Sequence, residues 1–470
     1  MASKNIELCY LSATDALSRF RDKSLSPVEM LEAQIARIED INPALNAIRA
    51  TRFEQARKDA RHAENVYASA PGAARALEGL PTALKNEHNL IGEVTDVGSR
   101  LLAHHVDTEN APITQRLLDA GALIHVRTHV PEFCVAPFTR SLAYGVTHNP
   151  WNAAMSCGGS SGGSGVALAT GMTTLASASD IGGSARIPAA YNGVVGLKPS
   201  YGRIPESTYE FAMNTYNHNA VMARSVADCA LLFNVANGPH PADPSTVKPK
   251  IRVALAQPSV QGMRIAVSLD LGFFEVDEDI RRNTLLAAQH LRDQGAIVEE
   301  VAIDWDASIR QTFTVGLGFL MVRDMRELVA GSHDCVSDFI VDTVDTLADF
   351  TPEEYMAAQE ASGGMHRALQ SVFERFDVLI CPTMASNDMP AEGSAKAHDY
   401  LLSHAMTYPF NVLSRHPVLS VPTGFSNNGV PTAVQIVAQT YCEPEAFRVG
   451  AALEKAVGWL TWRPVIGRPS

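Results

Sequence analysis

Hydrophobic and polar positions in the first 70 residues follow the periodicity of helices. Ser26 and Glu29 have the spacing of a capping box, which starts a helix, and apolar residues follow at helical intervals. We expect this helix to end at Asn42-Pro43, because the residue before a proline disfavours helical backbone. A second helix is predicted over residues 52–67. Residues 1–70 are therefore predicted to form a helical segment that packs on the core.

From about residue 78 the pattern changes to short apolar runs separated by glycines. Apolar runs of strand length alternate with amphipathic stretches of helix length. The predicted elements are helix 113–119, strand 123–126, strand 263–267, helix 277–292 and a strand that begins at 297–298. Strand–helix–strand units are typical of α/β proteins with a parallel or mixed sheet. Residues 237–250 hold four prolines and are expected to form a surface connection.

Composition and charge narrow the class of protein. The chain has 470 residues, of which 46% are hydrophobic, so it can bury a large core and is not disordered. Its formal net charge of −13 argues against nucleic acid as a partner, since a phosphate backbone attracts basic surfaces. The seven cysteines include no C-x-x-C pair, which argues against a disulfide framework or a zinc knuckle.

Apolar runs also give expectations about location. The N-terminal residues are polar and lack the apolar core of a secretory signal. No uninterrupted apolar run reaches about 18 residues, so no membrane-spanning helix is expected. We therefore predict a soluble, cytoplasmic protein.

Two clusters of small residues stand out, at 157–165 (CGGSSGGSG) and 180–188 (DIGGSARIP). Such glycines form either a flexible linker or tight turns that direct N–H groups at an anion, and the flanking apolar runs disfavour a linker. A phosphate-binding loop is excluded because valine, not lysine, follows Gly165. Residues 158–162 formally match the G-x-S-x-G nucleophile elbow. That motif and a dinucleotide-binding turn both need a preceding strand, which residues 152–156 do not predict.

Lys85 ends a short apolar stretch, residues 80–84, that is predicted to be a strand. A lysine at the end of a strand is usually a solvated charge. If Lys85 is desolvated instead, burial favours its neutral amine, which can act as a base.

Lys85 and the two glycine-rich clusters together resemble a known family, the amidase signature serine hydrolases. The resemblance continues through further motifs at 149–151, 193–203, 222–226, 377–383, 408–411 and 431–436. It covers nearly the whole chain after the N-terminal helices. It implies an α/β/α body around a large mixed β-sheet, with residues 1–70 as an N-terminal helical layer and residues 71–470 as the catalytic domain.

The resemblance implies a Ser–cis-Ser–Lys triad. Ser184 would be the nucleophile, Ser160 the bridging serine behind a cis peptide bond, and Lys85 the base. This chemistry is consistent, because a serine hydroxyl is a weak nucleophile until a base removes its proton. Lys85 would take that proton through Ser160, whose hydroxyl both donates and accepts. No cofactor is implied.

Residues around the triad would support the reaction. The resemblance implies an oxyanion hole made by the N–H groups of Ile181, Gly182, Gly183 and Ser184. Supporting roles would fall to Gly159, Asp180 and Arg186. A substrate pocket would be shaped by Phe133, Cys134, Phe138 and Tyr144, although Cys134 also suits a small buried position. The apolar stretch 313–322 is expected to be core or a helix that covers the pocket.

Departures from the family pattern lie outside the proposed triad. Asn86 follows the lysine where aspartate is usual, His129 stands where asparagine is common, and residues 219–221 replace a Gly-Pro pair. These positions would affect how the triad is held in place and the shape of the substrate pocket. The fifteen histidines include no H-E-x-x-H motif, and no catalytic metal is predicted.

These residues predict hydrolysis of a carboxylic amide through an acyl-enzyme, on a small-molecule amide or carbamate. Carbamate-cleaving (urethanase), aryl-acylamidase and esterase specialisations stay open, because all pass through similar tetrahedral intermediates. Another alternative is the amidase subunit of a tRNA-dependent amidotransferase. A catalytically silent binding protein is disfavoured because Lys85, Ser160 and Ser184 are all present. A homodimer also stays open.

Overall fold

A computed structural model describes residues 3–206, 214–347 and 349–466. Within them, eleven strands form one mixed sheet. In spatial order these are β1 (Ile48–Thr51), β3 (Leu123–Thr128), β2 (Pro81–Lys85), β6 (Leu175–Ser179), β8 (Asn219–Ala223), β7 (Val195–Lys198), β12 (Val418–Phe425), β13 (Pro431–Ala438), β11 (Val378–Pro382), β9 (Arg264–Val267) and β10 (Ile297–Glu300). Strands β3–β2–β6 and β11–β9–β10 are parallel, and the strands between β6 and β11 are antiparallel. A separate hairpin joins β4 (Arg140–Ser141) and β5 (Gly145–Val146).

Helices cover both faces of the sheet, so its strands are apolar on both sides. Ile265 and Val267 of β9 join one apolar core, whereas Ala266 between them joins another. The first core is closed by α2 (Ala13–Arg21), α5 (Pro112–Asp119), α8 (Val226–Ala236), α9 (Glu278–Asp293) and α16 (Glu443–Val457). The opposite face carries α6 (Gly162–Ala169), α7 (Arg186–Asn192), α10 (Ser308–Leu317), α12 (Asp338–Leu347) and α13 (Pro352–Phe373). The predicted α/β/α body around a mixed sheet is confirmed.

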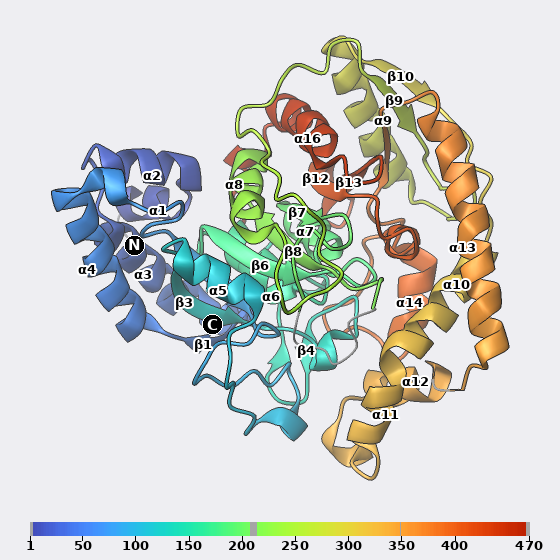
Figure 1. Cartoon of the computed structure of the whole chain (residues 1–470), viewed down its shortest axis with the longest axis horizontal. Coiled ribbons are helices and arrows are strands. Elements are labelled where there is room, and N and C mark those ends of the chain that lie inside the picture. The colour runs from blue at the N-terminus through green and yellow to red at the C-terminus, as the bar shows by residue number, and fades with distance from the viewer. Residues whose placement is uncertain (1–2, 207–213, 348, 467–470) are drawn as a thin grey trace.

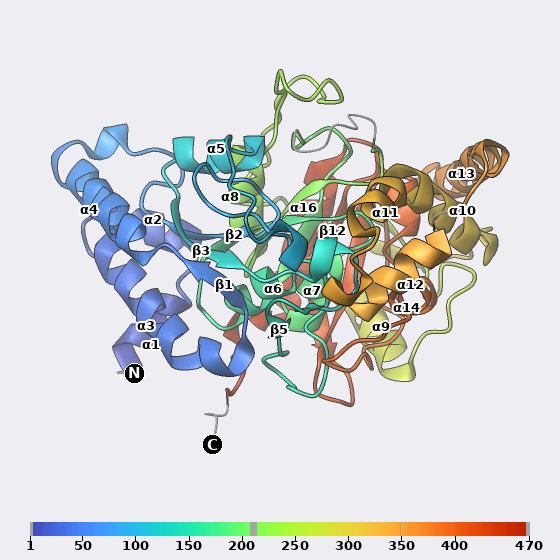
Figure 2. The same ribbon diagram turned by 90° about the horizontal axis from the view of Figure 1, so that it is seen from below.

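The N-terminal helices lie at one end of the molecule. Figure 1 shows α1 (Ser3–Cys9), α2, α3 (Pro27–Leu45) and α4 (Phe53–Ser69) in blue, opposite α10, α11 (Arg323–Val329) and α13, and Figure 2 shows the same separation from below. The predicted capping box of Ser26 and Glu29 starts α3. The sequence did not predict β1, which lies within this segment and pairs with β3. The division of the chain at residue 70 stays a prediction.

The predicted end of α3 at Asn42-Pro43 is wrong. The helix continues through Pro43 to Leu45, and Asn46 ends it in the left-handed conformation. Asn46 N donates to Asn42 O at 2.7 Å, while the Asn42 side chain accepts from the N–H groups of Ala47 and Ile48. A proline in the last turn removes only one backbone donor, so the local caps outweigh it.

Other elements fall close to their predicted bounds. Helices 113–119 and 277–292 are α5 and α9, and strands 123–126, 263–267 and 297–298 are β3, β9 and β10. Residues 237–250 form neither a helix nor a regular strand, as a surface connection should. In the part of the chain that the structure describes, no helix combines the length and the hydropathy needed to cross a membrane.

Candidate active site

Lys85 is the last residue of β2, and its side chain is completely buried. β2 is parallel to β6, whose last residue is Ser179, so both residues lie at the same edge of the sheet. Lys85 Nζ donates to Ser160 Oγ at 2.8 Å and to Ser179 Oγ at 2.6 Å. A buried lysine needs such partners, and the solvated alternative for Lys85 is excluded.

Ser160 follows a cis peptide bond, Gly159–Ser160, and stands just before α6. A side chain on Gly159 would come within 2.3 Å of Phe138 O, so only glycine fits there. A side chain on Gly162 would meet its nearest neighbour at 2.1 Å. The glycines of the 157–165 cluster therefore allow close packing of buried backbone, and the cluster is not a linker.

Ser184 lies in the turn between β6 and α7. Its carbonyl oxygen accepts from Ser161 N at 3.0 Å, which joins this turn to the segment that holds Ser160. The N–H of Gly183 donates to Asp180 Oδ1 at 2.9 Å. Among the described residues we find no protein acceptor for the N–H groups of Ile181, Gly182 and Ser184.

Asp180 and Arg186 form a completely buried ion pair behind the Ser184 turn. Arg186 donates to both carboxylate oxygens, at 2.8 and 2.9 Å, and also to Asn411 Oδ1 at 2.7 Å and Gln435 Oε1 at 2.9 Å. Burial alone would raise the pKa of Asp180. The charge of Arg186 and hydrogen bonds from Arg186 and Asn411 outweigh it and hold that pKa well below its usual range. Asp180 is therefore ionised at neutral pH, and its ion pair with Arg186 fixes the turn.

An apolar cavity opens at Ser184. Its polar end is formed by Ser184 itself together with Gly159 and Gly182. The remaining walls are largely apolar, and include Ile187 of α7, Phe313 and Leu317 of α10, Met321 of the π-helical turn η4 (Gly318–Val322) and Leu401 of α14 (Ala397–His404). The apolar stretch 313–322 thus contributes a wall of the cavity as well as core.

The four aromatic and thiol residues predicted for the pocket have different positions. Cys134 lines the apolar cavity. Phe138 is completely buried and packs edge-to-face against another phenylalanine, with ring centres 5.1 Å apart. Tyr144 donates to the Asp96 carboxylate. Phe133 packs on the neighbouring core, and both Phe133 and Cys134 have positive φ, of 52° and 61°. This backbone turn decides which side chain reaches the cavity.

Glu87 is an acid beside the lysine that sequence reasoning missed. Its Oε2 lies 2.8 Å from Lys85 Nζ and accepts from Ser179 Oγ at 2.6 Å. Burial alone would raise the pKa of Glu87, but the charges of Lys85 and His88 and hydrogen bonds from Lys85 and Ser179 lower it to about 2. Strand periodicity gives no signal for it, because Glu87 lies in the turn after β2, where its N–H donates to Lys85 O at 2.8 Å.

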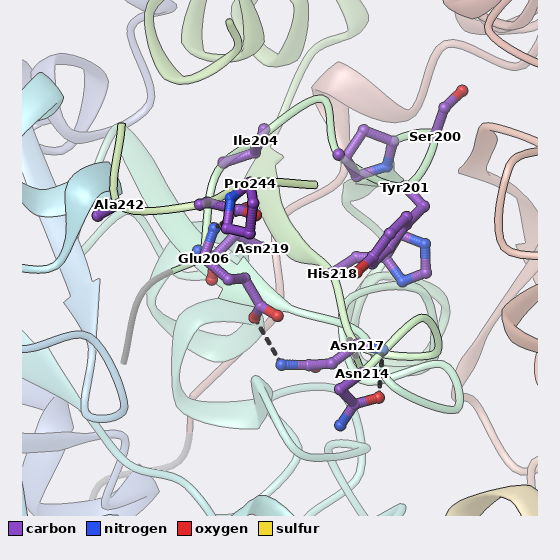
Figure 3. A pocket seen from close by; sticks show the side chains of 13 residues that line it. Ser200, Tyr201, Ile204, Glu206, Asn214, Asn217, His218, Asn219, Ala242 and Pro244 are labelled. Carbon is purple, nitrogen blue, oxygen red and sulfur yellow. Dashed lines mark hydrogen bonds between the residues drawn. The ribbon is translucent and has the colours of Figure 1, made fainter. Parts of the chain in front are cut away.

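A second pocket is polar, and its lining includes Glu206, Asn217 and Asn219 (Figure 3). Figure 3 shows Glu206 turned toward Asn217, whose Nδ2 donates to Glu206 Oε1 at 2.6 Å. Asn219 connects the pocket to the lysine site, because it pairs with Ser179 across β8 and β6. Its Oδ1 also lies 2.9 Å from His88 Nε2.

Two titratable groups of this region are neutral at pH 7. Burial lowers the pKa of His88 to about 4. Burial, together with the negative charges of Glu87 and Asp243, raises the pKa of Glu206 to about 8. The lysine site is therefore flanked by an uncharged imidazole and a largely protonated carboxyl.

Fold and site together define a class of protein, an enzyme that hydrolyses amides, and comparisons with known proteins support this. A family model described as Amidase matches residues 29–446. The chain belongs to this family, the amidase signature enzymes.

Individual relatives match over almost the whole chain. An acylamidase of Rhodococcus erythropolis is 32% identical over 99% of this chain and 98% of that protein. A glutamyl-tRNA(Gln) amidotransferase subunit from Synechococcus sp. (strain CC9605) is 30% identical over 94% of this chain and 95% of the relative. The crystal structure of a bacterial aryl acylamidase of the amidase signature family superposes with a TM-score of 0.89, at 28% identity, and covers 97% of this chain and 99% of its own.

Proposed function

We propose that the protein hydrolyses carboxylic amides through an acyl-enzyme formed on Ser184. One observation carries the proposal: the buried Lys85 Nζ donates to Ser160 Oγ at 2.8 Å, directly after the cis bond Gly159–Ser160. Ser184 lies in the turn bonded to this segment and lines a cavity together with Gly159. These contacts support the assignment of Lys85 as base, Ser160 as hydroxyl relay and Ser184 as nucleophile.

The reaction begins when Lys85 is neutral. Ser184 Oγ attacks the carbonyl carbon while its proton moves to Ser160 Oγ, and the Ser160 proton moves to Lys85 Nζ. The tetrahedral intermediate then collapses, and its C–N bond breaks. The proton returns from Lys85 through Ser160 to the leaving nitrogen. A water molecule hydrolyses the resulting ester by the same route, which releases the acid and restores Ser184.

Charge on the carbonyl oxygen is stabilised by the backbone of the Ser184 turn. The N–H groups of Ile181, Gly182 and Ser184 have no protein acceptor among the described residues, which supports an oxyanion hole at this turn. Gly183 N–H is engaged by Asp180 in this structure. Its role is therefore to hold the turn that presents the other three donors.

The apolar cavity supports an apolar or aryl acyl group on the substrate. Phe313, Leu317 and Leu401 offer hydrophobic walls next to the nucleophile. The acylamidase and aryl acylamidase similarities point the same way. Hydrolysis of carbamates (urethanase activity) and of esters passes through a similar tetrahedral intermediate. A panel of substrates that includes both classes tests these alternatives.

The similarity to an amidotransferase component defines an alternative in which the chain acts inside a complex. The net charge of −13 favours a free enzyme over one that contacts tRNA. Co-purification of the chain with further proteins from its own cells separates these alternatives. We also retain the cytoplasmic location as a proposal, supported by the seven cysteines, all within the described residues, none of which forms a disulfide bond. Homodimer formation is a question for sedimentation.

Labelling with a fluorophosphonate tests the nucleophile. The probe should modify Ser184, identified by peptide mass, and Ser184→Ala should abolish labelling and lower kcat on the order of 10⁶-fold, as in other serine hydrolases. Labelling that survives Ser184→Ala but disappears in Ser160→Ala would move the nucleophile to Ser160, as in an elbow. A panel of matched amide, anilide, carbamate and ester substrates then ranks the leaving groups.

A further inference from the structure

Lys85, the base of the proposed mechanism, contacts Glu87 as well as Ser160. Glu87 Oε2 is 2.8 Å from Lys85 Nζ, and Lys85 Nζ is also 2.8 Å from Ser160 Oγ. Ser179 Oγ bridges the pair, since it accepts from Lys85 Nζ at 2.6 Å and donates to Glu87 Oε2 at 2.6 Å. The side chains of Lys85 and Glu87 are 0% and 8% exposed, so water screens this contact little.

Other titratable groups around Glu87 do not compensate its charge. His88, on the same turn, is neutral at pH 7, because burial lowers its pKa to about 4. Cys134, which faces Glu87 and Ser160, stays a thiol, because burial raises its pKa. Glu206, which lines the polar pocket (Figure 3), is largely protonated at pH 7, because burial and the charges of Glu87 and Asp243 raise its pKa to about 8. Glu87 is therefore the anion that balances Lys85.

We propose that Glu87 is a positioning residue for the lysine base: it holds Lys85 Nζ against Ser160 and stabilises the protonated amine. The inference rests on the proposed function of Lys85. It goes beyond that function because it assigns the pH range of the enzyme to a residue outside the triad.

The same contact has two opposite effects on the rate. A carboxylate 2.8 Å from an amine favours the protonated form of that amine, which cannot accept the Ser160 proton. During acylation, the proton that leaves Ser184 arrives on Lys85, and Glu87 then stabilises the positive charge that forms there. Glu87 therefore slows the reaction at low pH and accelerates it at high pH.

Glu87→Gln, which keeps the shape and removes the charge, separates these effects. An opposite charge at this distance shifts a titration by about 1–3 pH units, so the acid limb of kcat/KM should move to lower pH by that amount. Suppose that half of the positive charge on Lys85 has developed in the transition state and that the acid limb shifts by about 2 pH units. The high-pH plateau of kcat/KM in Glu87→Gln is then roughly tenfold lower than in the wild type, and kcat/KM at low pH is roughly tenfold higher. The two pH profiles should cross.

Two further variants complete the design. Glu87→Asp keeps the charge and should retain the wild-type position of the acid limb with a lower plateau. Glu206→Gln removes a neighbouring carboxyl that bonds Asn217 and should move the limb less than Glu87→Gln does. Thermal unfolding checks that each variant is folded, and Glu87→Ala replaces Glu87→Gln if the latter does not fold. The rate of fluorophosphonate labelling of Ser184 against pH gives the same comparison without turnover.

Crossing profiles for Glu87→Gln support the inference. An acid limb that stays in place or moves to higher pH overturns it. An equal decrease in kcat/KM at all pH values also overturns it, because it would indicate a structural role for Glu87. Failure of the proposed function is recognised separately, because Lys85→Ala would then retain amide hydrolysis or Ser184 would not be labelled. Activity lost in Lys85→Ala with an unmoved limb in Glu87→Gln refutes only the role of Glu87.

Discussion

Replacing Asp180 by asparagine tests whether the buried ion pair holds the Ser184 turn in its active shape. Asp180 Oδ1 accepts from Gly183 N, Arg186 Nη2 and Asn411 Nδ2, and Oδ2 accepts from Arg186 Nε. Both oxygens therefore face donors. In Asp180→Asn, an NH2 group replaces one of the two oxygens, and in either orientation of the amide this group faces donors instead of acceptors. Arg186 also loses its buried counter-ion.

The size of the effect follows from this geometry. Removing one partner of a buried ion pair costs about 3–5 kcal/mol. The entropy of unfolding is roughly 2.1 cal/mol/K per residue, which for 470 residues amounts to roughly 1 kcal/mol/K. Asp180→Asn should therefore lower Tm by about 3–5 °C. A turn that no longer aligns one oxyanion donor should lower kcat by about 10²–10³-fold, with a smaller change in KM.

Two measurements on one preparation decide the matter. Circular dichroism gives Tm, and steady-state hydrolysis of an amide substrate, well below the lower Tm, gives kcat and KM. Asp228→Asn is the matched control. Asp228 is a buried aspartate on α8 that accepts from Ala13 N at 2.9 Å and Thr14 N at 3.1 Å, and it takes no part in the proposed reaction. It should lower Tm while kcat stays near the wild-type value.

Different results would refute different steps of the reasoning. If Asp180→Asn lowers Tm but leaves kcat unchanged, the ion pair stabilises the fold and does not shape the turn. If Asp180→Asn changes neither Tm nor kcat, the asparagine amide forms hydrogen bonds that replace those of the carboxylate, and the predicted decrease in Tm is wrong. A loss of kcat in Asp228→Asn of the same size would show that any destabilised variant loses activity.

Two substitutions at the site carry further predictions. Lys85→Ala should reduce kcat/KM far more for an amide than for a matched ester, because the ester leaving group needs less proton delivery; an equal loss on both would remove Lys85 from that step. Leu401→Ala should raise the kcat/KM ratio of bulky to small acyl groups, since the half-buried Leu401 lines the cavity beside Gly182. An unchanged ratio across an acyl series would place the acyl group elsewhere.

Local chemistry made some elements predictable from sequence. Ser26 and Glu29 cap α3 through contacts three residues apart, so neighbouring residues contain all the information needed. The sheet is different. β2 lies between β3 and β6, and β7 pairs with β12, more than two hundred residues further along the chain. Such pairings depend on the packing of whole layers, which periodicity does not encode.

The candidate site likewise contains residues that the sequence predicted and contacts that it did not. Lys85, Ser160 and Ser184 were predicted from the family resemblance, and the structure brings Lys85 and Ser160 into contact across 75 residues of chain. Tyr144 was predicted for the pocket from its aromatic character, yet it hydrogen-bonds Asp96. Positive φ at Phe133 and Cys134 redirects that loop, and composition gives no sign of it.

Three acids at the site show how the surroundings set charge. Burial acts in the same direction on Asp180, Glu87 and Glu206, since it disfavours every carboxylate. The outcome differs because Asp180 contacts Arg186 and Glu87 contacts Lys85, whereas the Glu206 carboxyl is bonded by an amide. The first two have a lowered pKa and the third has a pKa of about 8.

These protonation states determine the charge that a substrate meets. Below about pH 8, Asp180 and Glu87 each lie against a basic side chain and Glu206 is largely protonated, so these three acids add little net charge to the site. A neutral amide can therefore enter without an electrostatic penalty. Above that pH, Glu206 ionises and adds one negative charge, which the negative charge of Glu87 opposes.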